Sequence, residues 1–433
     1  MSATWIEDGQ LAMFKPARLI EKPFPSASNV RKVPVRFCAA MAALFCFLAI
    51  TSCLCCAQEH DVLCSDGSGG FEAESHTGVT VQVRAARNGG LAARRCEGIL
   101  GWNKHSVTIA TGASQLDIDA LGVDLGLDVP VAAFQVKRLD SDCCMDYQIY
   151  SLERPPRLLK TITGGDFFSA ADTDLDGRVE IWTDDTAAIS NFENLDVTEL
   201  GSAPTIVLRF AHGKLLDVSS EFQLYFDHEI AEIRKGLDSE DLSDFKRSDG
   251  KLSPDTQLSA ARLHQLRVVK ARILEIVWCY VYSGREQQAW RTLAEMWPTA
   301  DVGRIGAAIL SARARGIGAQ VNGVSTGVPA NRIKRVTIFD ATSASANKLE
   351  VIPPEPILLR RPSPSGPDLP QSELLLELVI DSAGKVRSAE EAGKAKSVDA
   401  ELIYAATGWK FIPAFKAGRA VASRLRLAVA LKR

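Results

Sequence analysis

The sequence has no excess of either charge, since 50 Lys and Arg stand against 53 Asp and Glu and leave a net charge of −3. This balance excludes a general electrostatic attraction to nucleic acid or to anionic lipid. The chain also lacks a P-loop, a dinucleotide-binding glycine fingerprint and an HExxH zinc motif, and its six histidines show no paired metal-ligand spacing. Half of the ten cysteines lie in one short stretch: Cys38, Cys46, Cys53, Cys55 and Cys56. This clustering excludes a disulfide-dense miniature scaffold.

Hydrophobic residues make up 46% and charged residues 24% of the 433 residues, which is typical of a folded protein. At roughly 150 residues per domain, the length predicts about three domains. We expect a multidomain protein with a β-rich N-terminal domain, an α-helical hairpin in the middle region and a small α+β C-terminal domain of order β-β-α-β. The segments are a leader with a signal peptide or membrane anchor (1–57), the β-rich domain (58–216), the helical region (217–320), a linker rich in Pro, Gly and Ser (321–370) and the C-terminal domain (371–433).

An uncharged apolar run extends from Phe37 to Ala57. It is long enough to cross about 30 Å of hydrocarbon as a helix. The basic residues before it are expected to stay in the cytoplasm, so we predict that the rest of the chain lies in the periplasm or on the extracellular side of the inner membrane. Three fates of the run stay open: cleavage after Ala57, retention as an anchor through residues 37–57, or lipidation of Cys53.

Two kinds of hydrophobic pattern follow the apolar run. Short β-branched and aromatic runs bounded by Gly, Asp, Asn or Pro predict strands at 78–83, 106–110, 131–136, 147–152 and 205–210. Apolar residues at helical spacing from Leu263 to Val277 predict a helix, and a Ser-Gly turn before Glu286 predicts an antiparallel helical hairpin ending at Pro298. This hairpin resembles one tetratricopeptide-type unit. Its aromatic residues are interpreted as core, with a peptide-binding groove as the alternative.

One acidic stretch carries the most specific chemical signal in the chain. Carboxylates at alternate positions converge when a tight loop curls around a cation, Gly177 permits the turn, and oxygen ligands in this number suit Ca²⁺. Residues 167–182 resemble the calcium loop between strands in the FG-GAP repeats of β-propellers, and this resemblance implies an ion that clamps a hairpin. The alternative is an acidic turn capped by its own side chains without metal. The predicted ligands are Asp172, Asp174, Asp176, Arg178 through its carbonyl, and Glu180.

Four cysteines of the β-rich domain would enter an oxidising compartment on export. These cysteines are Cys64, Cys96, Cys143 and Cys144. Four cysteines can form two bridges in three alternative ways. We favour Cys64–Cys96, which leaves Cys143 and Cys144 to form a vicinal bridge unless each pairs elsewhere.

The C-terminal region combines an alternating apolar strand from Leu374 to Ile380, a turn at Asp381–Gly384, a helix from Val398 to Ala406 and a final alternating strand after Gly418. Between helix and final strand stands the sequence Trp-Lys-Phe-Ile-Pro-Ala, starting at Trp409. This order resembles the TonB C-terminal domain over about residues 350–433. The resemblance implies a small sheet packed on a helix, with an exposed edge that accepts a partner strand. The predicted docking residues are Trp409, Phe411, Pro413, Arg424 and Arg426.

These features together predict an exported, non-catalytic protein of the bacterial cell envelope. It would bind or scaffold an envelope or outer-membrane protein through its C-terminal domain, with no nucleic acid partner. One alternative is a TonB-type energy transducer for outer-membrane transport. Another is a secreted hydrolase with its site in residues 61–215, because a nucleophile and base can meet in space from distant positions. The GxSxG pattern around Ser325 is interpreted as linker, since neither a strong strand nor a strong helix flanks it.

Overall fold

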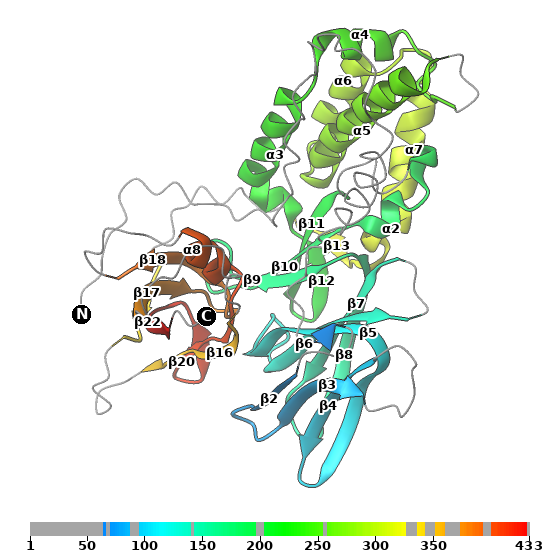
Figure 1. Ribbon diagram of the computed structural model, residues 1–433. Coiled ribbons are helices and arrows are strands. Elements are labelled where there is room, and N and C mark those ends of the chain that lie inside the picture. Colours follow the sequence, from blue (N-terminus) through cyan, green and yellow to red (C-terminus); the bar gives the residue numbers. More distant parts are fainter. Residues whose placement is uncertain are drawn as a thin grey trace, which may run out of the picture. The chain divides into compact units, whose positions relative to one another are not determined.

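The computed structural model describes residues 64–65, 70–86, 95–139, 143–195, 203–253, 258–325, 336–342, 351–359, 373–392 and 400–430 (Figure 1). The apolar run 37–57 and the lipidation candidate Cys53 lie outside the described residues. Among the helices that are described, none is long and apolar enough to cross a membrane. All of the described residues belong to one compact unit.

The largest sheet is antiparallel and follows the chain in order from β2 to β8, with the short β1 paired to β5. Its alternating apolar side chains build one core, in which Val81, Leu100 and Phe134 are fully buried. The runs predicted from 78 to 152 each overlap a strand of this sheet, so those predictions are confirmed. The strands are β1 (Cys64–Ser65), β2 (Phe71–Glu74), β3 (Thr80–Ala86), β4 (Arg95–Trp102), β5 (His105–Val123), β6 (Val131–Arg138), β7 (Met145–Ser151) and β8 (Arg157–Gly165).

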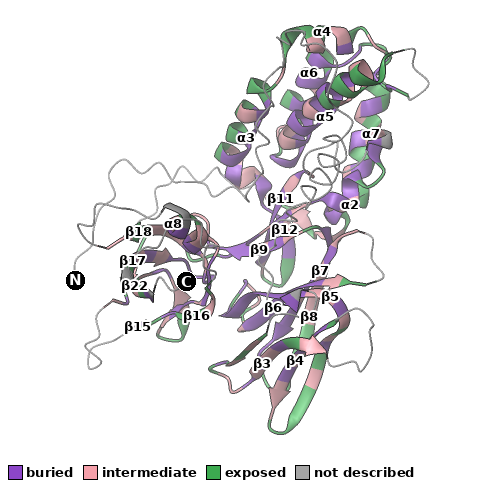
Figure 2. Ribbon diagram, in the orientation of Figure 1, coloured by how far each residue is buried: buried purple, intermediate pink, exposed green. Residues whose placement is uncertain are grey.

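Strand β5 changes its surroundings along its length. Its first residues, at the tip of the β4–β5 hairpin, are exposed, whereas every residue from Leu116 to Val123 is buried (Figure 2). Successive side chains of a strand point to opposite faces. Burial of both kinds of position therefore means that both faces of this half of β5 are covered.

A second sheet has the order β13-β12-β11-β10-β9. Strands β9 and β10 form an antiparallel hairpin in which Ala171 pairs with Glu180, and the residues between them, 172–179, are called the acidic loop below. The strand predicted at 205–210 is β11 and is confirmed. The strands are β9 (Phe168–Ala171), β10 (Glu180–Asp184), β11 (Thr205–Ala211), β12 (Lys214–Asp217) and β13 (Gly323–Val324), the last parallel to β12.

Most of the described helices lie between residues 223 and 315 and group together (Figure 1). The side chain of Ser259 caps the first turn of α5 by accepting a hydrogen bond from the amide of Arg262. The predicted helical hairpin is confirmed: α5 ends at a turn with Gly284 at φ 76°, and α6 follows. The helices are α2 (Thr186–Ile189), α3 (Gln223–Lys235), α4 (Ser239–Lys246), α5 (Ala260–Tyr282), α6 (Glu286–Met296) and α7 (Val302–Arg315), with 3₁₀ turns at Phe192–Asn194, Ser219–Phe222 and Ile317–Gln320.

The elements from β14 to β22 are called the C-terminal module. Its main sheet has the order β14-β22-β17-β18, and its core joins this sheet to α8 through Leu376, Leu402 and Trp409. The elements are β14 (Phe339–Asp340), β15 (Val351–Ile352), β16 (Glu355–Leu358), β17 (Glu373–Ile380), β18 (Val386–Glu391), α8 (Ala400–Thr407), β19 (Lys410–Ile412), β20 (Ala414–Lys416), β21 (Arg419–Val421) and β22 (Ser423–Ala430). The predicted combination of β-rich and helical parts is therefore confirmed.

Part of the predicted linker 321–370 is paired structure. Strand β15 pairs with β20 and β16 pairs with β19, so residues 351–358 belong to the C-terminal module. Proline donates no backbone hydrogen bond, which confines it to edge strands and bulges. Pro356 lies at a register shift of the two-strand pair β16–β19, where this constraint is satisfied. The proline-rich stretch 360–370 lies outside the described residues.

Candidate metal centre

The acidic loop is a tight turn held by its own backbone geometry. Leu175 and Gly177 adopt positive φ values of 56° and 84°, a region that glycine reaches without strain. The strand that leaves the loop begins at Glu180. The expectation of a strand rather than an EF-hand helix after the loop is therefore confirmed.

Three of the predicted ligands converge. Asp172, Asp174 and Asp176 each place a carboxylate oxygen within 4.8 Å of the others. Each also accepts a hydrogen bond from the loop backbone: Gly177 N–H donates to Asp172 Oδ2 at 3.0 Å, Asp176 N–H to Asp174 Oδ1 at 3.3 Å, and Arg178 N–H to Asp176 Oδ1 at 2.9 Å. This capping is common to the metal-bound and metal-free interpretations.

Asp172 distinguishes the two interpretations. Its side chain is 1% exposed, and its Oδ1 atom is buried without a hydrogen-bond partner among the described residues. Burial raises the pKa of the Asp172 carboxyl to about 7, with Asp381 and Asp174 adding to the rise. A buried oxygen left unpaired is costly and needs an explanation, and an oxygen-seeking cation beside Asp174 and Asp176 supplies one.

The other two predicted ligands anchor the loop. The Arg178 guanidinium donates from Nε to Asp176 Oδ2 at 2.7 Å. Glu180 is buried and accepts from the Thr173 amide at 3.2 Å and from Arg209 at 3.4 Å. Burial raises the pKa of Glu180 well above its ordinary value, and Asp174 adds to the rise. Both Glu180 oxygens therefore accept hydrogen bonds within the protein. Among the carboxylate, histidine and cysteine side chains of the described loop, the converging set consists of the three aspartates.

The acidic loop contacts the turn between β17 and β18. The amide of Asp172 donates to Asp381 Oδ2 at 3.1 Å, and the Ser382 hydroxyl donates to Asp172 Oδ2 at 2.7 Å. Arg387 donates to the carbonyl of Thr173 at 3.3 Å. Asp381 is fully buried, and burial raises its pKa to about 6 although Arg387 and Lys385 lower it.

Two lysines of the C-terminal module reach the covered face of β5. Lys385 Nζ lies 2.5 Å from Asp119 Oδ1 and 2.8 Å from the Asp119 carbonyl, and Lys410 Nζ donates to Asp117 Oδ2. The remaining oxygen of Asp119 accepts from the Tyr147 hydroxyl at 2.6 Å and from the amide of Ala170, on β9, at 2.7 Å. This contact could not be predicted from the sequence, because its aspartates stand at the polar positions of an alternating strand.

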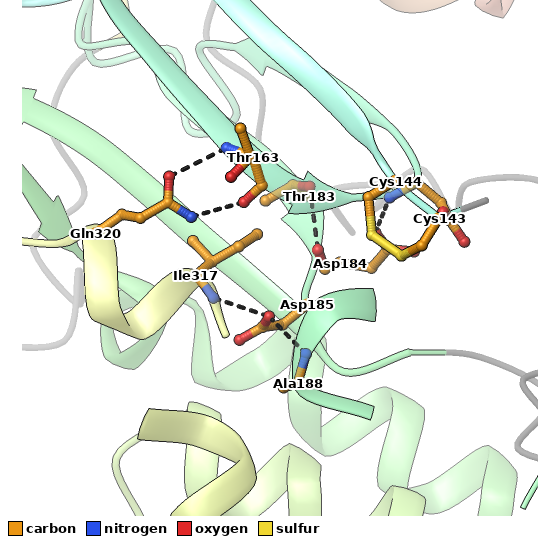
Figure 3. The surroundings of a disulfide bond; sticks show 10 residues. Cys143, Cys144, Thr163, Thr183, Asp184, Asp185, Ala188, Ile317 and Gln320 are labelled. Atoms are coloured by element: carbon orange, nitrogen blue, oxygen red, sulfur yellow. Dashed lines mark hydrogen bonds between the residues drawn. A yellow bond between two sulfur atoms is a disulfide. The ribbon is translucent and has the colours of Figure 1, made fainter. Parts of the chain in front are cut away.

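The cysteines of the β-rich region form two pairs. Cys64 and Cys96 are bonded with their Cα atoms 5.9 Å apart, and Cys143 is bonded to its neighbour Cys144 at 3.7 Å. Figure 3 shows the vicinal pair beside β10, near Asp184 and the buried Asp185. Asp185 accepts from the amides of Ala188 and Ile317, and Gln320 bonds both backbone groups of Thr163, so the last 3₁₀ turn is attached to β8 and α2 (Figure 3).

The five predicted docking residues fall into two groups. Trp409 and Phe411 are each 1% exposed and pack in the core of the C-terminal module, and Pro413 is buried as well. Arg424 and Arg426 are partly exposed at 38% and 55% and both pair with Glu377 on the neighbouring strand β17. A docking surface built from this set is thus restricted to the two arginines.

Ser325, the serine of the GxSxG pattern, follows the short strand β13. Its hydroxyl donates to Glu221 Oε1 at 2.7 Å, and both terminal nitrogens of Arg209 donate to Glu221.

Comparison of the chain with protein-family models, with curated proteins and with solved structures finds no match.

Proposed function

We propose that the protein is an exported cell-envelope protein that binds or scaffolds another envelope protein without catalysis, and that its acidic loop holds a structural Ca²⁺ ion. The observation that carries the proposal is the convergence of Asp172, Asp174 and Asp176 around a buried oxygen that has no partner. Several carboxylate oxygens on a short loop are the ligand set that Ca²⁺ prefers. An ion there would connect the two ends of the β9–β10 turn, which is a structural role.

The partner would bind at the edge of β22. Within the described residues, β14 pairs with only Ser423 and Arg424 of that strand, and the outer edge beyond them can accept a strand by β-augmentation. Arg426 is more than half exposed beside this edge, which favours an acidic partner segment. The order β17, β18, α8 and, after the three short strands β19 to β21, β22 supports the resemblance to the TonB C-terminal domain. Both cysteine pairs suit an oxidising compartment.

Calorimetry with Ca²⁺ tests the ion. A chain from residue 58 is suitable because it contains all of the described residues, which belong to one compact unit. We expect one ion per chain with a Kd on the order of 10⁻⁴–10⁻³ M, typical of extracellular modules. Asp174→Asn should abolish binding, whereas Glu240→Gln, which removes one exposed charge from α4, should leave it unchanged. Absence of binding at millimolar Ca²⁺ would refute the metal centre.

Two further measurements test the location and the partner. A reporter that is active only outside the cytoplasm, fused after residue 433, should be active, and an expressed but inactive fusion would refute export. A photo-crosslinking residue placed at Ala428, an exposed position of β22, should capture an envelope protein. The same residue at Glu240 is the control, and equal capture at both positions would refute docking at the β22 edge.

A further inference from the structure

Asp172 belongs to two contacts at once. Its Oδ1 atom is the buried oxygen without a partner in the converging set. Its Oδ2 atom accepts two hydrogen bonds, one from the loop amide of Gly177 at 3.0 Å and one from the Ser382 hydroxyl of the C-terminal module at 2.7 Å. One carboxylate therefore joins the candidate ion to a segment about 210 residues further along the chain.

Hydrogen bonds to the second oxygen of a metal-binding carboxylate fix its orientation and strengthen the metal site, and their loss typically weakens metal binding 10–100-fold. Ser382 stands in this position toward Asp172. Its turn is itself fixed, because Asp381 accepts from the amides of Ala383 and Lys385 at 2.9 Å each and from the amide of Asp172 at 3.1 Å. The Ser382 hydroxyl is thus presented to the acidic loop by a rigid turn.

The seating of the C-terminal module and the geometry of the acidic loop therefore depend on the same atoms. If the module moved away, Asp172 would lose the Ser382 hydroxyl, Asp381 would lose the Asp172 amide, and Thr173 would lose Arg387. An ion that orders the loop lowers the cost of presenting these groups. Thermodynamic linkage makes the effect reciprocal: the free energy by which the docked module strengthens Ca²⁺ binding equals the free energy by which bound Ca²⁺ strengthens docking of the module.

We propose that the C-terminal module completes the calcium site of the acidic loop, so that Ca²⁺ binding and the seating of the module strengthen each other. This inference rests on the proposed function, because it requires that the loop binds Ca²⁺. Ser382 acts as a positioning residue: it touches Asp172 and leaves the ion to the aspartates.

The test uses the chain from residue 58, calcium alone as the ligand, and two readouts. Calorimetry gives the affinity, and hydrogen–deuterium exchange follows the amides of Ala383 and Lys385 in the turn and of Phe411, which donates to the Gly384 carbonyl. In the unmodified chain, saturating Ca²⁺ should slow exchange of these amides about tenfold. Ser382→Ala should weaken Ca²⁺ binding about tenfold and reduce the protection by the same factor, whereas Ser311→Ala, at an exposed position of α7, should change neither.

The outcomes separate the two proposals. If the unmodified chain binds Ca²⁺ but exchange in the turn does not change, or if Ser382→Ala binds Ca²⁺ as tightly, the calcium site stands and its coupling to the module is refuted. If the unmodified chain binds no Ca²⁺ at millimolar concentration, the metal centre itself is refuted and the coupling with it. The exchange measurement on the unmodified chain needs no variant, so the inference stays testable even if Ser382→Ala folds poorly.

Discussion

Replacing Lys410 with Met removes one charge of a buried pair while keeping most of the side-chain volume. Lys410 is 11% exposed and its partner Asp117 is 1% exposed. Asp117 Oδ1 has no hydrogen-bond partner among the described residues, and burial raises the pKa of this carboxyl even with Lys410 beside it. Removing one partner of such a pair costs about 3–5 kcal/mol, because the remaining charge is left uncompensated in a poorly solvated place. We expect a loss of this size in the free energy of unfolding.

A second substitution separates the charge from the packing. Asp117→Asn in the Lys410→Met background removes the uncompensated charge and should recover about 2 kcal/mol of the loss. The loss caused by Lys410→Met alone should also shrink between pH 8 and pH 5, since Asp117 can then take up a proton. Urea unfolding of the chain from residue 58, followed by circular dichroism with the disulfides intact, measures both quantities.

Lys235→Met is the matched control, because Lys235 is 72% exposed on α3 and pairs with Glu232 at the surface. Exposed pairs contribute about 0–1 kcal/mol, so this variant should unfold almost as the unmodified chain does. A loss below about 1 kcal/mol for Lys410→Met, or a double variant no more stable than the single one, would refute the buried contact between β5 and the C-terminal module.

Three other predictions test separate parts of the fold. Burial raises the pKa of Asp184 from 3.8 to about 7. The contribution of this carboxyl to the free energy of unfolding is therefore most favourable below pH 4 and is lost as the pH rises through 7. In urea unfolding, Asp184→Asn should be more stable than the unmodified chain by about 2–4 kcal/mol at pH 8 and by almost nothing at pH 4. Gly384 has φ 85°, and a Cβ at this position would clash with the backbone oxygen of Phe411 in β19, so Gly384→Ala should lower the free energy of unfolding by more than 3 kcal/mol. Gly418 has a similar φ of 77° but open space around it, so Gly418→Ala should lower it by about 1 kcal/mol. Equal losses for the two variants would contradict this packing. Replacing Cys64 and Cys96 with Ser removes a cross-link that spans 32 residues, which should lower the free energy of unfolding by about 3–4 kcal/mol. An unchanged midpoint of urea unfolding would show that the pair is not bonded in the purified protein.

The hairpin that carries the acidic loop could be predicted from the sequence because its signals are local. The spacing of Asp172, Asp174 and Asp176 defines the turn, Gly177 supplies the positive φ, and the alternation after Glu180 defines the strand. The helical hairpin α5–α6 was predictable for the same reason, since a 3.6-residue period and a Ser-Gly turn need no distant partner.

The contact between β5 and the C-terminal module could not be predicted in this way. The alternation Leu116, Asp117, Ile118, Asp119 is typical of a strand with one face in water. Nothing local indicates that this face is covered by Lys385 and Lys410, which follow their aspartate partners by 266 and 293 residues in the chain. The same limit applies to residues 351–358, which were predicted to belong to the linker 321–370, whose proline content favours an extended, semi-rigid spacer. Their pairing with β19 and β20 depends on strands that follow much later in the chain.

The contacts of the C-terminal module with the rest of the chain and its proposed partner edge use different parts of its sheet. The internal contacts include those of the β17–β18 turn, of Arg387 on β18, and of β16 and β19, whereas the proposed edge belongs to β22, which β17 separates from β18. A partner strand added to β22 therefore does not compete with the contact at Asp172. β17 pairs with β22 along its whole length from Glu373 to Ile380 and leads directly into the turn at Asp381, so one strand connects the proposed edge to the Ser382–Asp172 hydrogen bond.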